Sequence, residues 1–428
     1  MTPALAATGA RTPGSGGLVG EPPPAARLSS AGAAFILLKS ALGAGLLAFP
    51  WAFQRAGGLL PALLLELVSL VFLASGLLTL GYAAAVSGQT TYQGVVAALC
   101  GRAAGRLCEG CFTGNLLLIA AALLRVVGDQ LEKLYGALLP GAPRPWYLDQ
   151  RFSLGLVALL LLPLSAPRHI RGHTLSSLLG TLAACYLALL TVAQYYLGPP
   201  RALPQPRPPP SPGVSALAVF PTICFGFQCH EAAVSVYSSM RRRDLRHWAL
   251  VSGLSLLACC LIYSLTGVFG FLTFGAEASA DILLSYPASD PAVLAARVLF
   301  AASVVTVYPI VLFLGRSVLQ DLWGRSRCRA LADPLSTAGR VLLTALWVAV
   351  TLAAALLLPD LGDIIGVIGG LSAFFIFIFP GLCLICAVGH EPIGPGARRG
   401  LEAWGAVSVL AGAFIFGQST AAAVLELV

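Results

Sequence analysis

The sequence has few charged residues. Lys, Arg, Asp and Glu make up 10% of its 428 residues, hydrophobic residues make up 57%, and the mean hydropathy is +0.85. Soluble globular domains carry about 25% charged residues, so this composition excludes a water-soluble globular protein. The sequence predicts a protein that crosses a membrane several times.

Other residue types are scarce as well. Five histidines are scattered along the chain, and no GxSxG, HExxH or phosphate-loop pattern occurs, so we predict that it is not an enzyme and has no cofactor. Asn115 is the only asparagine and is followed by leucines, which excludes an N-glycosylation sequon. No cysteine lies in a predicted outside loop, so we expect no external disulfide framework.

Continuous apolar runs recur along the chain. About 20 apolar residues cross the hydrocarbon of a bilayer as a helix, and the absence of period-two alternation excludes an outer-membrane barrel. We predict eleven spans, at residues 33-53, 59-86, 107-127, 152-166, 175-197, 214-236, 249-272, 293-314, 341-358, 364-388 and 401-424. Residues 1-28 are rich in Pro, Gly and Ala and predict a disordered tail, so the transmembrane domain covers 29-428.

Basic residues predict the orientation of the spans. Arginines gather in the loops on one side, for example at 241-243, whereas the 273-292 loop on the other side is acidic. The positive-inside rule then places the N-terminus in the cytoplasm and the C-terminus outside. The net charge of +8 needs no nucleic acid to explain it. We expect the plasma membrane, with a lysosomal membrane as the alternative, and no motif in the tails indicates a protein partner.

Two of the predicted spans carry residues that interrupt a helix. The first contains Gly43, Ala44 and Gly45 before a Phe-Pro pair, and the sixth contains Phe220 and Pro221 before Gly226. Glycines allow unwinding, and an unwound segment at membrane depth must line a cavity or be buried in protein. The alternative is that the glycines only pack helices closely and the prolines only kink them.

The two interrupted spans are five apart in order. This spacing predicts inverted-topology repeats at about 29-197 and 214-388, with an extra helix at 401-424. In transporters of that design, substrate and coupling ion bind at the membrane midplane, between the interrupted helices.

Polar residues inside the predicted spans are further candidates, because an ionised group there costs roughly 2.5 to 3.5 kcal/mol. His230 either couples transport to protons or forms a hydrogen bond between helices. Glu231 either neutralises a cation in the pathway or pairs with a basic residue. Ser303 and Thr306 lie one turn apart and either bind sodium or bond back to their own helix.

Two motifs indicate a family. GAGLLAFPWAF at 43-53 and FGFQCHEAAVSVYSSM at 225-240 resemble the first-helix and sixth-helix motifs of the sodium-coupled neutral amino acid transporters, in the amino acid/auxin permease superfamily. The resemblance extends from about Ser29 to the C-terminus. It implies an all-α, eleven-helix LeuT-type fold with alternating access. It also implies cotransport of sodium with small neutral amino acids such as glutamine and alanine, in some members with proton exchange.

The resemblance also implies site residues. Backbone at 43-46 and 224-226 would meet the α-carboxylate and α-amine of the substrate. The predicted substrate-binding residues are Gly43, Ala44, Gly45, Leu46, Cys224, Phe225, Gly226, Cys229 and His230. The predicted cation-coupling residues are Lys39, Ser40, Ser303 and Thr306, and His230 and Glu231 are the candidates for proton coupling.

Lys39 departs from the family pattern. Most members carry an asparagine there, which is thought to help hold sodium, and an ammonium group cannot bind a cation. Three hypotheses follow: Lys39 reaches the cytoplasmic interface, its charge replaces sodium, or it carries a proton. Thr306 is also offset from the family's sodium-associated threonine when Pro309 is the anchor. A sodium-independent or proton-coupled carrier, and an amino-acid sensor with little flux, therefore remain alternatives.

Overall fold

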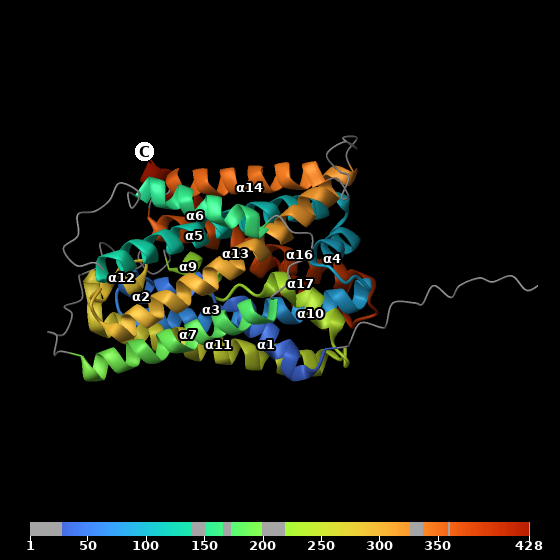
Figure 1. Cartoon of the computed structure of the whole chain (residues 1–428). Coiled ribbons are helices and arrows are strands. Elements are labelled where there is room, and N and C mark those ends of the chain that lie inside the picture. Colours follow the sequence, from blue (N-terminus) through green and yellow to red (C-terminus); the bar gives the residue numbers. More distant parts are fainter. Residues whose placement is uncertain are drawn as a thin grey trace, which may run out of the picture.

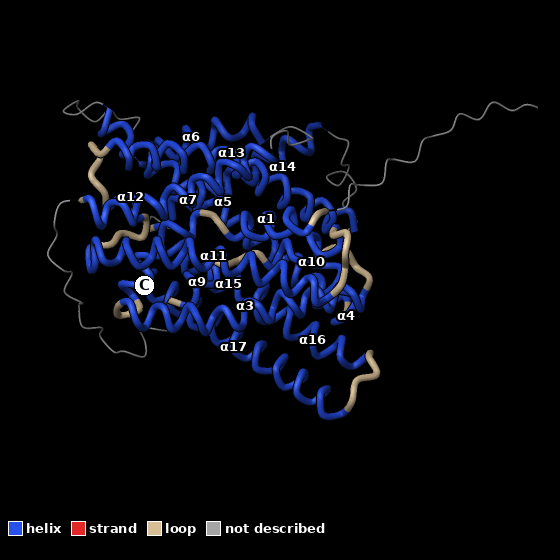
Figure 2. Tube along the Cα trace, turned by 90° about the horizontal axis from the view of Figure 1, so that it is seen from below, coloured by secondary structure: helices blue, strands red, loops and turns tan. Residues whose placement is uncertain are grey.

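The computed structural model describes residues 28–138, 150–165, 173–198, 219–325, 337–357 and 360–427. Apart from Leu28, the tail predicted over 1-28 lies outside these ranges. Helices account for almost all the regular structure in the described ranges (Figure 2), and a single isolated bridge joins Leu28 to Met240. The protein is therefore all-α over its described ranges.

The long helices of the first half run in roughly the same direction (Figure 1). The elements of this half are α1 (Ser30–Ala41), η1 (Ala44–Ala48), α2 (Phe49–Arg55), α3 (Leu59–Ser87), α4 (Tyr92–Cys100), α5 (Arg102–Leu138), α6 (Gln150–Ser165) and α7 (His173–Leu197).

The second half continues the bundle. Its elements are α9 (Phe220–Gly226), α10 (His230–Ser239), α11 (Leu245–Phe274), η3 (Gly275–Glu277), α12 (Ile282–Ser285), α13 (Pro291–Arg325), α14 (Thr337–Leu357), α15 (Leu361–Ala373), the π-helical turn η4 (Phe374–Ile378), α16 (Phe379–His390) and α17 (Pro395–Leu427). Helix α1 begins and helix α17 ends at opposite ends of the bundle (Figure 1).

Within the described ranges, eight helices are long and apolar enough to cross a membrane, or nine when the bent pair of α1 with η1 and α2 is counted as one span. Helix α6 is shorter, with an apolar stretch over Phe152–Pro163. Helices α9 and α10 have 7 and 10 residues and are each too short to span alone. The predicted number of eleven spans therefore stays a prediction.

Helix α3 has one face exposed at the surface of the bundle and one face packed against other helices. It exposes a stripe of large apolar side chains, namely Leu60, Leu64, Leu67, Val68 and Val71. Its other side buries small residues, among them Gly76 and Ala83, against neighbouring helices. This is the arrangement of a helix whose outer face meets lipid and whose inner face packs closely against other helices.

Both predicted interruptions occur in the structure. Helix α1 ends at Ala41, and its axis turns by 51° into the segment Ala44–Arg55. Helix α9 ends at Gly226, and α10 begins at His230. The hydroxyl of Tyr263 in α11 donates a 2.9 Å hydrogen bond to the carbonyl of Ala41, so a carbonyl at the end of α1 has a partner that lipid could not supply.

The two interruptions are in contact with each other. A Cβ atom on Gly45 would lie 2.9 Å from the Cα of Gly226, and one on Gly226 would lie 2.7 Å from the ring of Phe49. Helix α15 closes the other side of α9, where a Cβ on Gly369 would overlap the carbonyl of Pro221. Glycine is required at these positions because backbone meets backbone or a buried ring.

Candidate functional site

A cavity of about 230 Å³ lies where the two interruptions meet. Its wall is formed by the end of α1 and the start of η1, by Phe225, Gln228 and Glu231, and by segments of α5, α7 and α13. Ser176 and Gly180 belong to the wall, so the cavity extends toward the end of the bundle at which α7 begins. Most of the remaining wall is apolar, with leucines from α5 and valines from α13.

Several of the sequence-predicted residues lie on this wall. From the substrate-binding set they are Gly43, Ala44, Gly45 and Phe225. From the coupling sets they are Lys39, Ser40, Ser303 and Glu231. The structure thus brings residues from α1, the sixth predicted span and α13 to the wall of one cavity. Lys39 and Ser303, the two that are farthest apart in the sequence, are separated by 264 positions.

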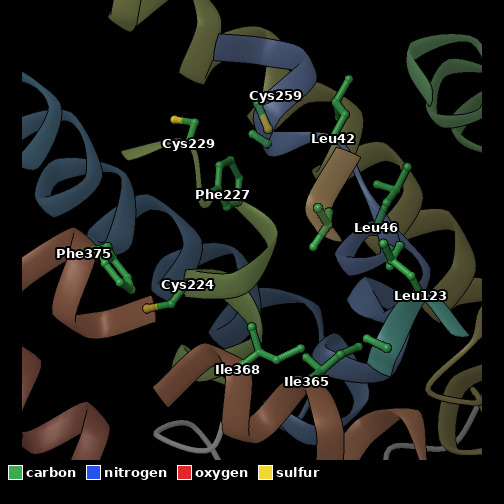
Figure 3. Packing of buried hydrophobic residues seen from close by; sticks show 14 of the residues in the cluster. Leu42, Leu46, Leu123, Cys224, Phe227, Cys229, Cys259, Ile365, Ile368 and Phe375 are labelled. Atoms are coloured by element: carbon green, nitrogen blue, oxygen red, sulfur yellow. The ribbon is translucent and has the colours of Figure 1, made fainter. Parts of the chain in front are cut away.

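Other predicted residues are packed away from the cavity. Leu46 is fully buried, and Cys224 and Cys229 are each 2% exposed. Figure 3 shows the two thiols among buried apolar side chains. Gly226 is covered by Phe49 and Tyr263. A role for these four residues in substrate binding would therefore have to come from their backbone or from their support of the wall.

His230 lies between helices and off the cavity wall. Its ring is fully buried, and its Nε2 is 3.0 Å from the carbonyl oxygen of Leu73 in α3. Gly76, one turn later, makes room for the ring, because a Cβ there would be 2.9 Å from Nε2. This geometry corresponds to the second of the two hypotheses for His230, a hydrogen bond between helices.

Thr306 is also off the wall. Its hydroxyl donates a 2.8 Å hydrogen bond to the carbonyl of Ser303 in its own helix. Ser303 itself faces the cavity opposite Gly180. Of this predicted pair, the structure therefore brings only Ser303 to the site.

A polar network at the cavity was not predicted from the sequence. Asn115 of α5 donates from Nδ2 to Oε1 of Glu231 at 2.8 Å, and Gln228 donates from Nε2 to the same oxygen at 2.9 Å. Ser372 of α15 donates to Oε1 of Gln228 at 2.7 Å. Glu231 itself was a candidate from the sequence, and one signal pointed to a partner: Asn115 is the sole asparagine of the chain and falls inside a predicted span.

The cavity wall offers hydroxyl, carboxylate and backbone oxygens but no metal cluster. Among the residues that the structure describes, no group of three or more His, Cys, Asp or Glu side chains could hold a metal ion. The cysteines of the described ranges are free thiols, and the CxxC pairs at 108-111 and 383-386 are interpreted as helix-packing residues.

Comparison with known proteins identifies the family. The model of the family described as "Transmembrane amino acid transporter protein" matches residues 26–423. The chain is 66% identical to "Solute carrier family 38 member 8" of Homo sapiens, over 97% of this chain and 99% of that one. It is 42% identical to "Sodium-coupled neutral amino acid transporter 7" of Xenopus laevis, over 95% and 93% of the two chains.

A solved structure supports the fold. The chain resembles MhsT in complex with L-phenylalanine with a TM-score of 0.57, at 14% identity, over 90% of this chain and 98% of that one. This confirms the predicted LeuT-type fold, and the family confirms that the chain is not an enzyme. The chain belongs to the transmembrane amino acid transporter family and, within it, to the sodium-coupled neutral amino acid transporters.

Proposed function

We propose that this protein is a secondary transporter of small neutral amino acids, glutamine and alanine among them, that works by alternating access. The observation that carries the proposal is the cavity at the contact between two interrupted helices, where Gly43 to Gly45 and Phe225 lie on one wall. Freed backbone N–H groups suit a carboxylate, and freed carbonyls suit a cation. The relatives named as sodium-coupled neutral amino acid transporters support the substrate class.

The coupling ion is a separate part of the proposal. Ser40 and Ser303 lie on the cavity wall and could offer hydroxyl oxygens to sodium, but Lys39 lies on the same wall. An ammonium group at the cavity favours a carrier in which its charge takes the place of sodium, because two cations at one site repel each other. The names of the relatives favour sodium.

Uptake of radiolabelled glutamine into proteoliposomes separates these possibilities. Wild-type protein is assayed with sodium and with choline in its place, beside Lys39→Asn. If the ammonium replaces sodium, wild-type uptake is unchanged in choline, and Lys39→Asn loses several-fold of its uptake in choline but not in sodium. Wild-type uptake at background level in choline would contradict the replacement.

The chain supplies a matched control. Lys133 in α5 is the only other lysine, and it is not part of the cavity wall. Lys133→Asn should behave as wild type in both salts. Saturable uptake with trans-stimulation would support a carrier, whereas binding of glutamine without accumulation of label would favour an amino-acid sensor. Surface labelling of cells against a lysosomal marker tests the proposed plasma-membrane location.

A further inference from the structure

Glu231 is held in one orientation at the cavity. It lies in the first turn of α10, directly after the interruption. Its Oε1 accepts hydrogen bonds from Asn115 at 2.8 Å and from Gln228 at 2.9 Å, and Ser372 in turn fixes Gln228. Three segments distant in sequence therefore position a single carboxylate group.

The second oxygen of this carboxylate has no partner and is not enclosed. Among the residues that the structure describes, no donor lies within hydrogen-bonding distance of Oε2. This oxygen is also absent from the enclosed polar atoms that lack a partner, and the Glu231 side chain is part of the cavity wall. Oε2 is thus the carboxylate oxygen that a bound molecule can reach.

The negative charge of Glu231 has no positive partner in the described part of the chain. Lys39 lies on the same cavity wall, yet the two side chains do not form an ion pair. An ionised carboxylate at membrane depth is unfavourable without a partner. A ligand that brings a positive charge would therefore gain both the electrostatic attraction and a hydrogen bond.

Oε2 of Glu231 is the acceptor of this network that is left free at the cavity. Oδ1 of Asn115 also has no hydrogen-bond partner among the described residues, but it is enclosed and Asn115 is not part of the cavity wall. Buried acceptors are normally satisfied. The group that completes this network must donate hydrogen bonds, and an ammonium group has three donors and no acceptor.

We propose that Glu231 binds the α-ammonium group of the transported amino acid through Oε2. The inference rests on the proposed function and names a side chain that would select its substrates. A metal ion would need several oxygen ligands at once, whereas the α5 wall of the cavity contributes Leu116, Ile119 and Leu123. A single carboxylate oxygen is sufficient for a charge-assisted hydrogen bond from an ammonium group.

Binding to the purified full-length chain tests this directly. The midpoint of thermal unfolding in detergent is followed against the concentration of L-alanine and of L-lactate, which carries a hydroxyl group in place of the ammonium group. A ligand that binds the native state raises this midpoint. Wild type should bind L-alanine about 10 to 100 times more tightly than L-lactate, as expected for one charge-assisted hydrogen bond.

Glu231→Gln keeps an oxygen that can accept from Asn115 and Gln228 but removes the charge. It should weaken L-alanine binding about 10 to 100-fold and leave L-lactate binding nearly unchanged, so that the preference disappears. The matched control is Glu66→Gln, a carboxylate between α3 and α11 that is bonded by Ser264 and lies away from the cavity. Glu66→Gln should keep the wild-type preference.

Two outcomes would overturn the assignment. In the first, Glu231→Gln keeps the preference for L-alanine; if it also removes a pH dependence of binding, Glu231 is a proton site. In the second, wild type binds no amino acid, which would also contradict the proposed function. If L-alanine binds as predicted and proteoliposomes show no uptake, the transport proposal fails and the role of Glu231 stands.

Discussion

His230 lies between helices and away from the cavity wall, so its position does not fit a role in the transport pathway. It is fully buried and bonded to the Leu73 carbonyl at 3.0 Å, so we expect it to hold α10 against α3. His230→Ala should lower the thermal midpoint by a few degrees, because loss of a buried hydrogen bond and of ring packing costs about 1 to 3 kcal/mol. The shape of glutamine uptake against pH, from about pH 5.5 to 8, should stay as in wild type.

A partly exposed histidine provides the control for this prediction. His247 is bonded to the Ser30 hydroxyl at 2.8 Å near the surface, and His247→Ala should change neither the midpoint nor the pH profile. If His230→Ala instead flattened the pH profile of an otherwise stable protein, the structural role would be contradicted and the proton-coupling hypothesis supported.

Sequence reasoning reached some residues of the site and missed others for a physical reason. The glycines at 43 and 45 could be recognised from the local sequence, because a glycine pair before Phe-Pro inside a predicted span indicates an interrupted helix. The partners of Glu231 are not local. Asn115 is 116 positions away, and Ser372 is 144 positions from Gln228. Such pairs depend on how each helix is rotated against its neighbours, which hydropathy does not specify.

At the scale of helices, the interruptions could be predicted and their mutual contact could not. Glycine marks where α1 and α9 end, because it disfavours the helix interior, and Pro50 and Pro221 lie in the first turns of α2 and α9. The contact between Gly45 and Gly226 depends on α9 lying against η1 and α15 lying against α9. The short helix α12 and the π-helical turn η4 were likewise not predicted, because tertiary packing rather than periodicity positions them.

Gly45→Ala tests the contact between the two interrupted helices. The added Cβ would lie 2.9 Å from the Gly226 Cα and 3.2 Å from the Phe225 ring, and backbone on both sides leaves little room to adjust. Overpacking of this kind costs about 1 to 3 kcal/mol. We expect a lower thermal midpoint and a loss of most glutamine uptake.

Gly253→Ala is the matched control in α11, where nothing lies within 4 Å of the added atom. It should leave uptake unchanged and raise stability slightly, since alanine is favoured over glycine in a helix by up to about 1 kcal/mol. Wild-type uptake and stability in Gly45→Ala would show that the two segments are not packed as closely as described.

At the scale of the whole molecule, the cavity extends toward the end at which α7 begins, and the opposite end is covered. There α12 lies against η1 and α5. Asp281, which caps α12 through the Leu283 N–H at 3.0 Å, also accepts a 2.5 Å hydrogen bond from Gln130 of α5. Arg297 of α13 supports the same segment by donating to the carbonyls of Leu283 and Tyr286. In an alternating-access transporter this packing would have to separate when the cavity opens to the α12 end.

Asp281 makes that separation sensitive to pH. Burial, and to a lesser extent the nearby Asp129, raises the pKa of Asp281 from 3.8 to about 7, although the Leu283 N–H, Gln130 and Arg297 act in the opposite direction. Asp281 released to water would titrate near its ordinary value. Its contribution to the packed arrangement is therefore complete at about pH 3.8 and below, and is lost as the pH rises through about 7.

Uptake into proteoliposomes should accordingly rise several-fold between about pH 4 and pH 7 and level off above that, because ionisation of Asp281 favours opening at the α12 end. Asp281→Asn stays uncharged at every pH and should give a flat profile at the level that wild type shows in acid. Asp290→Asn is the control. Asp290 is another loop carboxylate, which accepts hydrogen bonds from Gln194 at 2.5 Å and from the Ala292 N–H at 2.8 Å. Asp290→Asn should show the same rise of uptake with pH as wild type. A rise of uptake with pH that persists in Asp281→Asn would assign the pH sensitivity to another group. It would also contradict the hypothesis that α12 must separate from α5 before substrate enters.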